Sequence, residues 1–240
     1  MSILIKGLQK LTLLDYPGKI ACTVFLGGCN FRCPFCHNGS LVLPERMGET
    51  ISKEDFLAFL DSRRGRLQGV CVSGGEPTLQ PDLPELLYEI KSRGFSVKLD
   101  TNGTNPEMLS ALVSDGLVDY VAMDIKNSLA KYAETAGVKN AECRVQSAEF
   151  LLHNVKESAS LLMQGRVDFE FRTTLMKEFH TRDDMRAIGE WLRGDEKLFL
   201  QTYREEGDLI VGGFTPFTRE ETESLLGVLR EYIPTAEIRG

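Results

Sequence analysis

The chain has 240 residues, of which 42% are hydrophobic and 26% charged, so it can bury a core of ordinary size and falls within the range of a one-domain α/β barrel. Its 35 acidic and 28 basic residues give a net charge of -7 without a cluster of Lys and Arg, which excludes a general role in binding nucleic acid or an anionic membrane. No apolar run approaches the roughly 18 residues that span a bilayer, and the first residues lack a signal peptide's apolar stretch, so we expect a cytoplasmic protein.

Residues 1–19 precede the regular part of the chain, because Gly7, Pro17 and Gly18 interrupt two short apolar stretches. We expect an irregular or hairpin-like N-terminal extension there. From residue 20 onward, short runs rich in Val, Ile, Phe and Leu alternate with segments of helical period. These runs predict six strands, at 20–26, 68–73, 95–100, 118–125, 167–175 and 197–203.

Helical segments lie between the predicted strands. Ser52, with Asp55 three residues later, marks one helix start, and apolar residues recur at helical spacing in 142–156 and 220–232. Strands that alternate with helices form parallel sheets. The sequence therefore predicts a partial (β/α)6 TIM-like barrel with its helices outside, formed as a single core domain by residues 20–240.

Three cysteines, Cys29, Cys33 and Cys36, follow the first predicted strand within eight residues. A closed iron–sulfur cubane and a structural zinc site each use four ligands, and the chain has no second CxxC motif to complete this set. We therefore expect the three thiolates to hold an iron–sulfur cluster in which one iron lacks a protein ligand.

The spacing of the cysteines is also compatible with two simpler arrangements. In the first, a helix places all three on one apolar face, but Pro34 disfavours that helix. In the second, a zinc site is completed by His37 or Cys22. His37 directly follows Cys36 and reaches the same ion only with strain, whereas Cys22 lies inside a predicted strand. A zinc-stabilised binding protein without catalysis is the remote alternative.

Polar residues follow the other predicted strands at their carboxyl ends. In chain order they are Gly74, Gly75 and Glu76, then Asp100, Thr101 and Asn102, then Asp124 and Lys126, then Arg172, and finally Gln201. In α/β barrels this end carries the active site, so we expect these residues to share one site with the cysteines. Most of them could simply form turns or helix caps. Asp124 and Lys126 are harder to account for in that way, since they put two charges on one face of an apolar strand.

The motifs CNFRCPFCHN, GGEP, DTNG and DIK together resemble the radical S-adenosylmethionine (SAM) superfamily, in particular the activating enzymes of glycyl-radical enzymes. The resemblance spans most of the chain. The CHN ending and the preceding LLDYPGKIACTVFLGGC are most similar to the activating proteins of anaerobic ribonucleoside-triphosphate reductase, with the pyruvate formate-lyase activating enzymes as close relatives. The VPG motif of the latter is absent after Arg172, and residues 41–70 lack the extra cysteine clusters of glycerol dehydratase or benzylsuccinate synthase activators.

The resemblance implies one 4Fe-4S cluster on Cys29, Cys33 and Cys36, whose fourth iron is chelated by the amino and carboxylate groups of SAM. It further implies that the reduced cluster cleaves SAM to methionine and a 5′-deoxyadenosyl radical, which takes a hydrogen atom from a glycine of a partner enzyme. The implied partners are anaerobic ribonucleoside-triphosphate reductase and an electron donor such as flavodoxin or ferredoxin. A formate-lyase-type partner and a small-molecule substrate are the alternatives.

The same resemblance distributes the remaining site residues around SAM. Those expected near the adenine or ribose are Phe35, His37 and Gln201. Those expected at the methionine amino group are Gly74, Gly75 and Glu76. Those expected at the methionine carboxylate are Asp100, Thr101 and Asp124, with positive charge from Lys126 and Arg172. Asn102 is also expected to bind SAM. The formate-lyase activators bind a monovalent cation at these carboxylates, and the resemblance extends to such a cation here.

Overall fold

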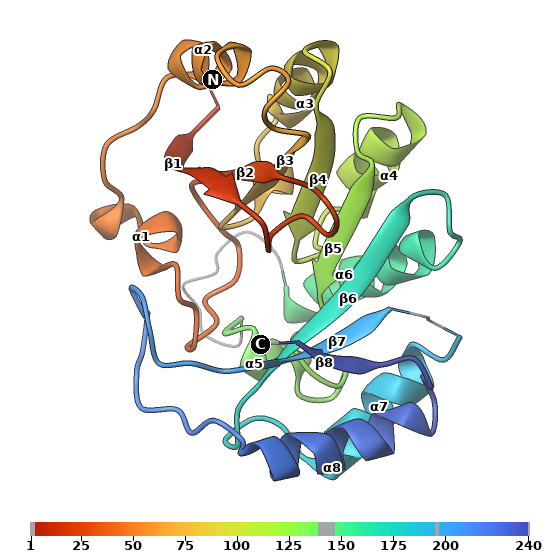
Figure 1. The fold of residues 1–240 in the computed structure, drawn as a ribbon. Helices are drawn as coiled ribbons and strands as arrows, with labels where there is room; N and C mark the ends of the chain where they lie inside the picture. The colour runs from red at the N-terminus through yellow and green to blue at the C-terminus, as the bar shows by residue number, and fades with distance from the viewer. Residues whose placement is uncertain (1–2, 139–146, 195–196, 240) are drawn as a thin grey trace.

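A computed structural model of the chain describes residues 3–138, 147–194 and 197–239. The described residues form one curved sheet of eight strands that follow one another in chain order (Figure 1). The strands are β1 (Ile5–Thr12), β2 (Ala21–Leu26), β3 (Gly69–Gly74), β4 (Ser96–Thr101), β5 (Tyr120–Asp124), β6 (Asp168–Leu175), β7 (Leu198–Thr202) and β8 (Glu237–Arg239). Strands β2 to β8 are parallel, and β1 pairs antiparallel with β2.

The six predicted strands correspond to β2 to β7, with ends that differ by two residues or fewer. The predicted partial barrel is confirmed, because no ladder in the described part of the chain joins β8 back to β1. The sequence pattern missed both edge strands. Strand β1 lies in the extension expected to be irregular or hairpin-like, and it forms a hairpin with β2 because Ile3 and Ile5 are buried against the sheet. Strand β8 is only three residues long, too short for a periodic pattern.

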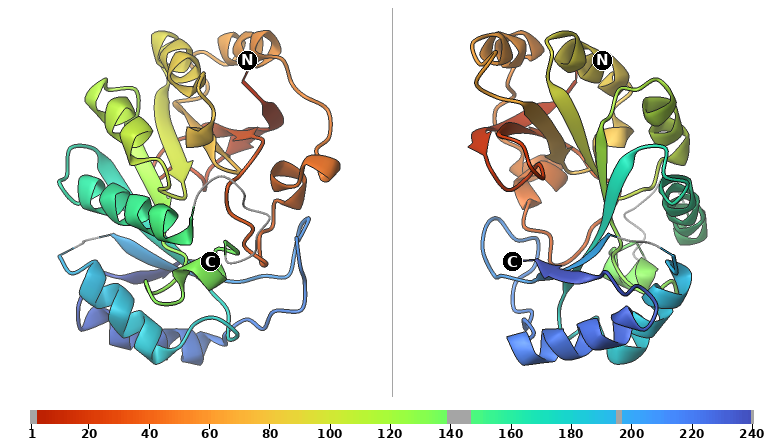
Figure 2. Two further views of the ribbon diagram at one scale, coloured as in Figure 1. Left: turned by 180° about the vertical axis from the view of Figure 1, so that it is seen from behind. Right: turned by 45° about the vertical axis from the view of Figure 1, so that its right-hand side comes forward.

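Helices cover the convex face of the sheet (Figures 1 and 2). They are α2 (Lys53–Asp61), α3 (Leu83–Ser92), α4 (Pro106–Ser114), α6 (Ala148–Leu162), α7 (Arg182–Trp191) and α8 (Arg219–Arg230), with short turns at α1 (Gly39–Val42), η1 (Pro44–Arg46), η2 (Pro77–Leu79) and α5 (Tyr132–Thr135). The predicted Ser52 cap accepts a hydrogen bond from the Asp55 N–H at the start of α2. Of the helix predicted at 142–156, residues 142–146 lie outside the described residues. None of the described helices is long and apolar enough to cross a membrane.

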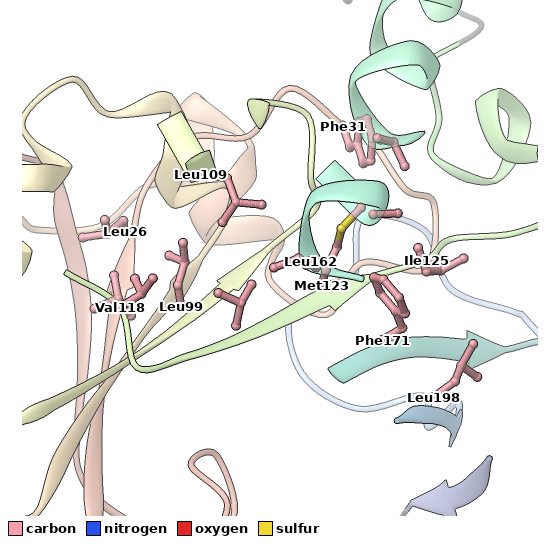
Figure 3. Close-up of a cluster of buried hydrophobic side chains, with 14 of the residues drawn as sticks. Leu26, Phe31, Leu99, Leu109, Val118, Met123, Ile125, Leu162, Phe171 and Leu198 are labelled. Carbon is pink, nitrogen blue, oxygen red and sulfur yellow. The ribbon is translucent and has the colours of Figure 1, made fainter. Parts of the chain in front are cut away.

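The two faces of the sheet differ in chemistry. On the convex face, Leu99, Met123 and Phe171 of the central strands pack with Leu109 of α4 and Leu162 of α6, and all five are essentially inaccessible to solvent (Figure 3). Side chains alternate along a strand, so the neighbours of these residues face the barrel interior. These neighbours include charged groups from β4, β5 and β6, namely Lys98, Asp100, Asp124, Glu170 and Arg172. The interior is therefore a polar site rather than a second apolar core.

Leu99→Ala should lower the free energy of unfolding by about 2–5 kcal/mol, because it removes a side chain that is 0% exposed and leaves a cavity between β4 and the helices. Leu14→Ala is the matched control, since Leu14 is 88% exposed and its truncation should cost less than about 0.5 kcal/mol. Urea denaturation of the cofactor-free chain measures both. Equal losses would contradict the assignment of the convex face as the main core.

Candidate active site

A pocket opens at the carboxyl ends of strands β2 to β6 and contains most of the predicted site residues. The predicted residues that line it are Cys29, Cys33, Phe35, Cys36, His37, Gly74, Gly75, Asp100, Thr101, Asn102, Asp124, Lys126 and Arg172. Glu76 and Gln201 are outside this lining. The sequence motifs did not indicate five lining residues, namely Phe31, Asn38, Val42, Ser73 and Thr174. Thr174 could have been found, because it lies two residues from Arg172 on the same face of β6, and Ser73 directly precedes the predicted Gly74.

The cysteine loop, residues 27–38, is held on one side by a distant segment, residues 204–214, which we call the strap. Strap N–H groups donate to loop carbonyls from Ile210 to Cys36 (3.1 Å) and from Val211 to Pro34 (2.9 Å). The Gly39 N–H donates in return to the Asp208 carbonyl over 2.7 Å. The loop is thus fixed through its backbone, which leaves its cysteine side chains free to face the pocket.

The other side of the cysteine loop rests on the turn after α5. The Arg32 N–H donates to the Ala136 carbonyl over 3.0 Å, and the Cys33 sulfur lies 3.7 Å from the same oxygen. Gly137, with a φ of +68°, crosses the Arg32 carbonyl so closely that a Cβ atom would lie 1.9 Å from that oxygen. A glycine is therefore required at the crossing.

The three cysteine sulfurs are buried or partly buried, and burial raises the pKa of each thiol, to about 12 for Cys33. Such thiols ionise near neutral pH only when a cation binds their sulfur atoms. The Cys29 sulfur also has two nearby donors, the Phe31 N–H at 3.4 Å and the Asn102 side-chain amide at 3.8 Å. Hydrogen bonds of this kind stabilise a thiolate that binds metal. The donor set thus fits the three protein ligands of an iron–sulfur cluster.

A mononuclear zinc site fits less well. Zinc in structural sites needs four ligands about 2.0–2.3 Å from one point. Among the described residues, no three His, Cys, Asp or Glu side chains converge in a way that could hold a single metal ion. His37 stacks on Tyr203, with ring centroids 5.4 Å apart and planes inclined by 25°. Its ring is therefore positioned by an aromatic contact.

The floor of the pocket carries a network of opposite charges. Arg172 contacts both carboxylates, at 3.0 Å from Asp124 and 3.6 Å from Asp100, and Lys126 lies 2.9 Å from Asp124. Burial alone would raise the pKa of Asp124, but Lys126 and Arg172 lower it to about 2. Against the effect of burial, Asp124 raises the pKa values of both cations, and Asp100 also raises that of Arg172. All these groups are therefore ionised at neutral pH.

The Gly74-Gly75 turn crosses the cysteine loop without room for side chains. A Cβ on Gly74 would lie 2.1 Å from the Leu26 carbonyl, and one on Gly75 would lie 2.1 Å from the Gly28 carbonyl. The N–H groups of Gly75 and Glu76 donate to these two carbonyls over 2.9 and 2.8 Å. Because its N–H groups are used, the turn can offer carbonyl oxygens to a ligand.

Glu76 is 0% exposed and forms hydrogen bonds with the loop after β4. Its carboxylate accepts hydrogen bonds from the Thr78 N–H (3.0 Å), the Thr101 hydroxyl (2.8 Å) and the Asn102 N–H (2.6 Å). The Thr78 hydroxyl donates as well. These contacts place Glu76 behind the pocket, where it fixes Thr101 and Asn102. Gln201 is also set back, 3.5 Å from the Thr174 hydroxyl that lines the pocket.

His180 supports the site in a way that the sequence did not indicate, since a histidine without a local motif is typical of a surface position. It is 2% exposed, and its Nε2 lies 3.0 Å from the Lys126 carbonyl. The Asp124 carbonyl in turn accepts a hydrogen bond from the Tyr132 hydroxyl over 3.2 Å. Both contacts fix the backbone that carries the Asp124–Lys126 pair.

The profile of the radical SAM superfamily matches residues 23–176, which include the cysteine loop and the floor of the pocket. A protein of Methanocaldococcus jannaschii, provisionally named a glycyl-radical enzyme activating enzyme, is 33% identical over 100% of this chain and 97% of its own length. The chain belongs to the glycyl-radical enzyme activating enzymes of the radical SAM superfamily. This superfamily uses a 4Fe-4S cluster and SAM, and the three-sulfur donor set described above fits that chemistry.

Other relatives of this radical SAM chain have different names. The pyruvate formate-lyase 1-activating enzyme of Escherichia coli is 26% identical over 91% of the chain and 92% of its own length. The 7-carboxy-7-deazaguanine synthase of Neisseria meningitidis is 32% identical, over 52% of each chain. Among solved structures, Streptococcus suis SuiB bound to S-adenosylmethionine has a TM-score of 0.66 at 14% identity, covering 88% of this chain. The chain spans about half the length of SuiB, 48%, and that likeness shows the fold alone.

Gly137→Ala should destabilise the chain and reduce its iron content after anaerobic reconstitution, because the new Cβ forces the Arg32 carbonyl and the cysteine loop to move. Gly116→Ala is the matched control, since Gly116 has a similar φ of +65° but open space around its Cβ position. It should cost only the roughly 1–2 kcal/mol of left-handed backbone and retain full iron. Equal iron content in both variants would contradict the role of the crossing.

Glu76→Gln should lower the free energy of unfolding of the cofactor-free chain by about 2–3 kcal/mol. The amide NH2 of Gln would face N–H and O–H groups whose hydrogen bonds the Glu76 carboxylate accepts. Glu85→Gln, at an exposed position on α3, should change it by less than about 0.5 kcal/mol. Chemical denaturation measures both. Unchanged stability with weakened SAM binding would instead show that Glu76 contacts the ligand.

Proposed function

We propose that this chain binds a 4Fe-4S cluster and SAM in the pocket described above and installs a glycyl radical on a partner enzyme. One observation carries the proposal: three thiols and a charged floor meet in a single pocket, while the other described cysteines, Cys22 and Cys71, lie within strands β2 and β3. A three-cysteine set leaves one iron of a cubane without a protein ligand. The family membership of the chain supports the same conclusion.

Cys29, Cys33 and Cys36 would hold the cluster, which, when bound and reduced, supplies the electron that cleaves SAM to methionine and a 5′-deoxyadenosyl radical. The chain itself keeps the cluster site in shape. The strap and the turn at Ala136 hold the loop backbone from two sides, and the donors at Cys29 stabilise its thiolate. Phe35 packs on Phe179 with ring centroids 5.9 Å apart, which fixes the backbone between Cys33 and Cys36.

The two ends of a bound amino acid moiety find complementary groups in the pocket. Lys126 and Arg172 would attract the methionine carboxylate of SAM, since a guanidinium and an ammonium both favour a carboxylate partner. Carbonyl oxygens of the Gly74-Gly75 turn would accept from the ammonium group. Asp100, Thr101, Asn102 and Asp124 would complete the wall around the methionine, and Phe35 and His37 would contact the adenine. Glu76 and Gln201 would act from behind the lining.

Transfer of the radical to the partner requires no acid or base from the chain. A glycine Cα–H bond of the partner would break homolytically as the hydrogen atom forms a C–H bond with the 5′-carbon of the 5′-deoxyadenosyl radical, which gives 5′-deoxyadenosine and leaves one unpaired electron on the glycine Cα. The protein must hold that glycine against the pocket and exclude water, because a primary carbon radical reacts with any loose hydrogen donor. Positioning and exclusion of solvent are therefore the catalytic contributions of the protein.

The partner that we propose is an anaerobic ribonucleoside-triphosphate reductase, with electrons supplied by a flavodoxin or ferredoxin in the cytoplasm. The CHN ending of the cysteine loop supports this choice over a pyruvate formate-lyase. A small-molecule substrate is the second candidate, favoured by the 32% identity that half of the chain shares with 7-carboxy-7-deazaguanine synthase. Detection of a glycyl radical distinguishes the ribonucleotide reductase, the formate-lyase and the small-molecule substrate.

Cys33→Ala should abolish reductive SAM cleavage and lower the iron bound after reconstitution, because it removes one of three cluster ligands. Cys22→Ala, a buried cysteine of β2, is the control that should retain the iron and the cleavage. Iron and sulfide analysis together with chromatography of 5′-deoxyadenosine measures both properties. Continued 5′-deoxyadenosine formation by the Cys33 variant would contradict the ligand assignment.

The reconstituted, reduced protein, mixed anaerobically with SAM and each candidate glycyl-radical enzyme of the same organism, should produce a glycyl doublet in the electron paramagnetic resonance spectrum of one partner. A doublet on the ribonucleotide reductase supports the proposed partner, and a doublet on a formate-lyase supports the alternative. SAM cleavage without a doublet on any candidate would contradict the activating function and favour a small-molecule substrate.

A further inference from the structure

Lys98 is a buried ammonium that no part of the proposed function uses. It lies on β4, two residues before Asp100 and on the same face of the strand, and it is 1% exposed. Its ammonium donates to Asp100 Oδ1 and lies 3.8 Å from the sulfur of Cys71 on the neighbouring strand. An ammonium so far from solvent is costly unless its charge is paired, so its place beneath the pocket requires a physical reason.

Positively charged side chains beneath the pocket already pair with Asp100 and Asp124, where a further cation would bind. Lys98 and Arg172 contact Asp100 Oδ1, Arg172 contacts Asp124 Oδ1, and Lys126 contacts Asp124 Oδ2. Three of the four carboxylate oxygens therefore carry a cationic partner. With Glu170 and its partner Arg239 included, four positive and three negative groups make the cluster net positive, which suits the anionic carboxylate of a ligand and opposes an additional metal cation.

The monovalent cation implied by the family resemblance therefore does not fit this pocket. A cation between Asp100 and Asp124 would have to compete with Arg172, which spans both carboxylates, and with Lys98, which is enclosed by the strands beside Asp100. An ammonium group has the charge of K⁺ and a similar size. It differs in being covalently attached and permanently present.

We propose that the Lys98 ammonium takes the place of a bound monovalent cation, so that the pocket holds Asp100 in position and binds SAM independently of K⁺ or Na⁺. The inference rests on the proposed function of the pocket as the SAM site. Lys98 is a positioning residue, because among the described residues it reaches the pocket only through Asp100, which lines it. SAM binding is then independent of K⁺ and Na⁺ because of one residue, Lys98.

Two substitutions of Lys98 separate the missing charge from the missing volume. Lys98→Ala removes the charge and opens a space in which K⁺ could replace it, whereas Lys98→Met removes the charge and fills the space. Lys91→Ala, at a partly exposed lysine paired with Asp119, is the control. Lys98→Arg keeps a buried positive charge and tests for rescue.

The first measurement is the dissociation constant of SAM, by anaerobic equilibrium dialysis of reconstituted protein in KCl or in tetramethylammonium chloride at equal ionic strength. The wild type, Lys91→Ala and Lys98→Arg should bind equally in both salts. Both neutral variants should bind about tenfold more weakly in tetramethylammonium, a loss of about 1.4 kcal/mol, and only Lys98→Ala should recover in KCl. Tighter binding by the wild type in KCl, or unchanged binding by both neutral variants, would overturn the inference.

The second measurement is the melting temperature of the cofactor-free chain as KCl replaces tetramethylammonium chloride. Lys98→Ala should gain several degrees and the wild type and Lys98→Met none. A K⁺-dependent rise in the wild type would overturn the inference even if the neutral variants fail to fold. Neither measurement uses a partner enzyme, so the absence of a glycyl radical would reject the proposed function and leave these results unaffected.

Discussion

The pairing of Asp124 with Arg172 determines the character of the pocket. The two residues lie directly opposite each other in the ladder between β5 and β6, and a shift of one residue would place Phe171 at the pocket and the guanidinium among the helices. The register thus keeps the apolar side chains on the convex face and the charges inside. Once Asp124, Lys126 and Arg172 are paired, Asp100 can also be buried beneath the pocket, because Arg172 spans both carboxylates. The charged interior is what distinguishes this partial barrel from a simple packed core.

The cysteine loop depends on the same sheet but is shaped by contacts from elsewhere in the chain. The Gly74-Gly75 turn crosses it from β3, Gly137 crosses it beyond α5, and the strap pairs with it from the far end of the sequence. All three contacts use backbone atoms, so the loop holds its conformation without using its cysteine sulfurs. In the proposed function, Cys29, Cys33 and Cys36 would hold a cluster in the same pocket as a floor that attracts a carboxylate, and SAM would supply groups that bind both. Recognition of the cofactor and activation of its sulfonium would therefore occur in one small volume.

Much of this arrangement could be predicted from the sequence, because its signals are local. Six apolar runs marked β2 to β7, and the residues just after them identified the pocket, since parallel strands bring their carboxyl ends together. The remainder depends on contacts between distant residues. Lys98, between Val97 and Leu99, pairs with Asp100 of its own strand, but its burial beneath the pocket follows only once β4 lies between β3 and β5. The GGEP motif marked Glu76 as a site residue, but only the fold shows that it accepts hydrogen bonds from Thr101 and Asn102. The strap, about 170 residues after the cysteine loop, has no periodic pattern at all.

The central claim is that SAM completes the cluster held by Cys29, Cys33 and Cys36. Electron–nuclear double resonance of the reduced, reconstituted protein tests it most directly, with SAM labelled by ¹⁵N at the amino group or by ¹⁷O at the carboxylate. We predict hyperfine coupling of both labels to the cluster. Bound SAM without coupling from either label would contradict the claim and would place the cofactor away from the open iron.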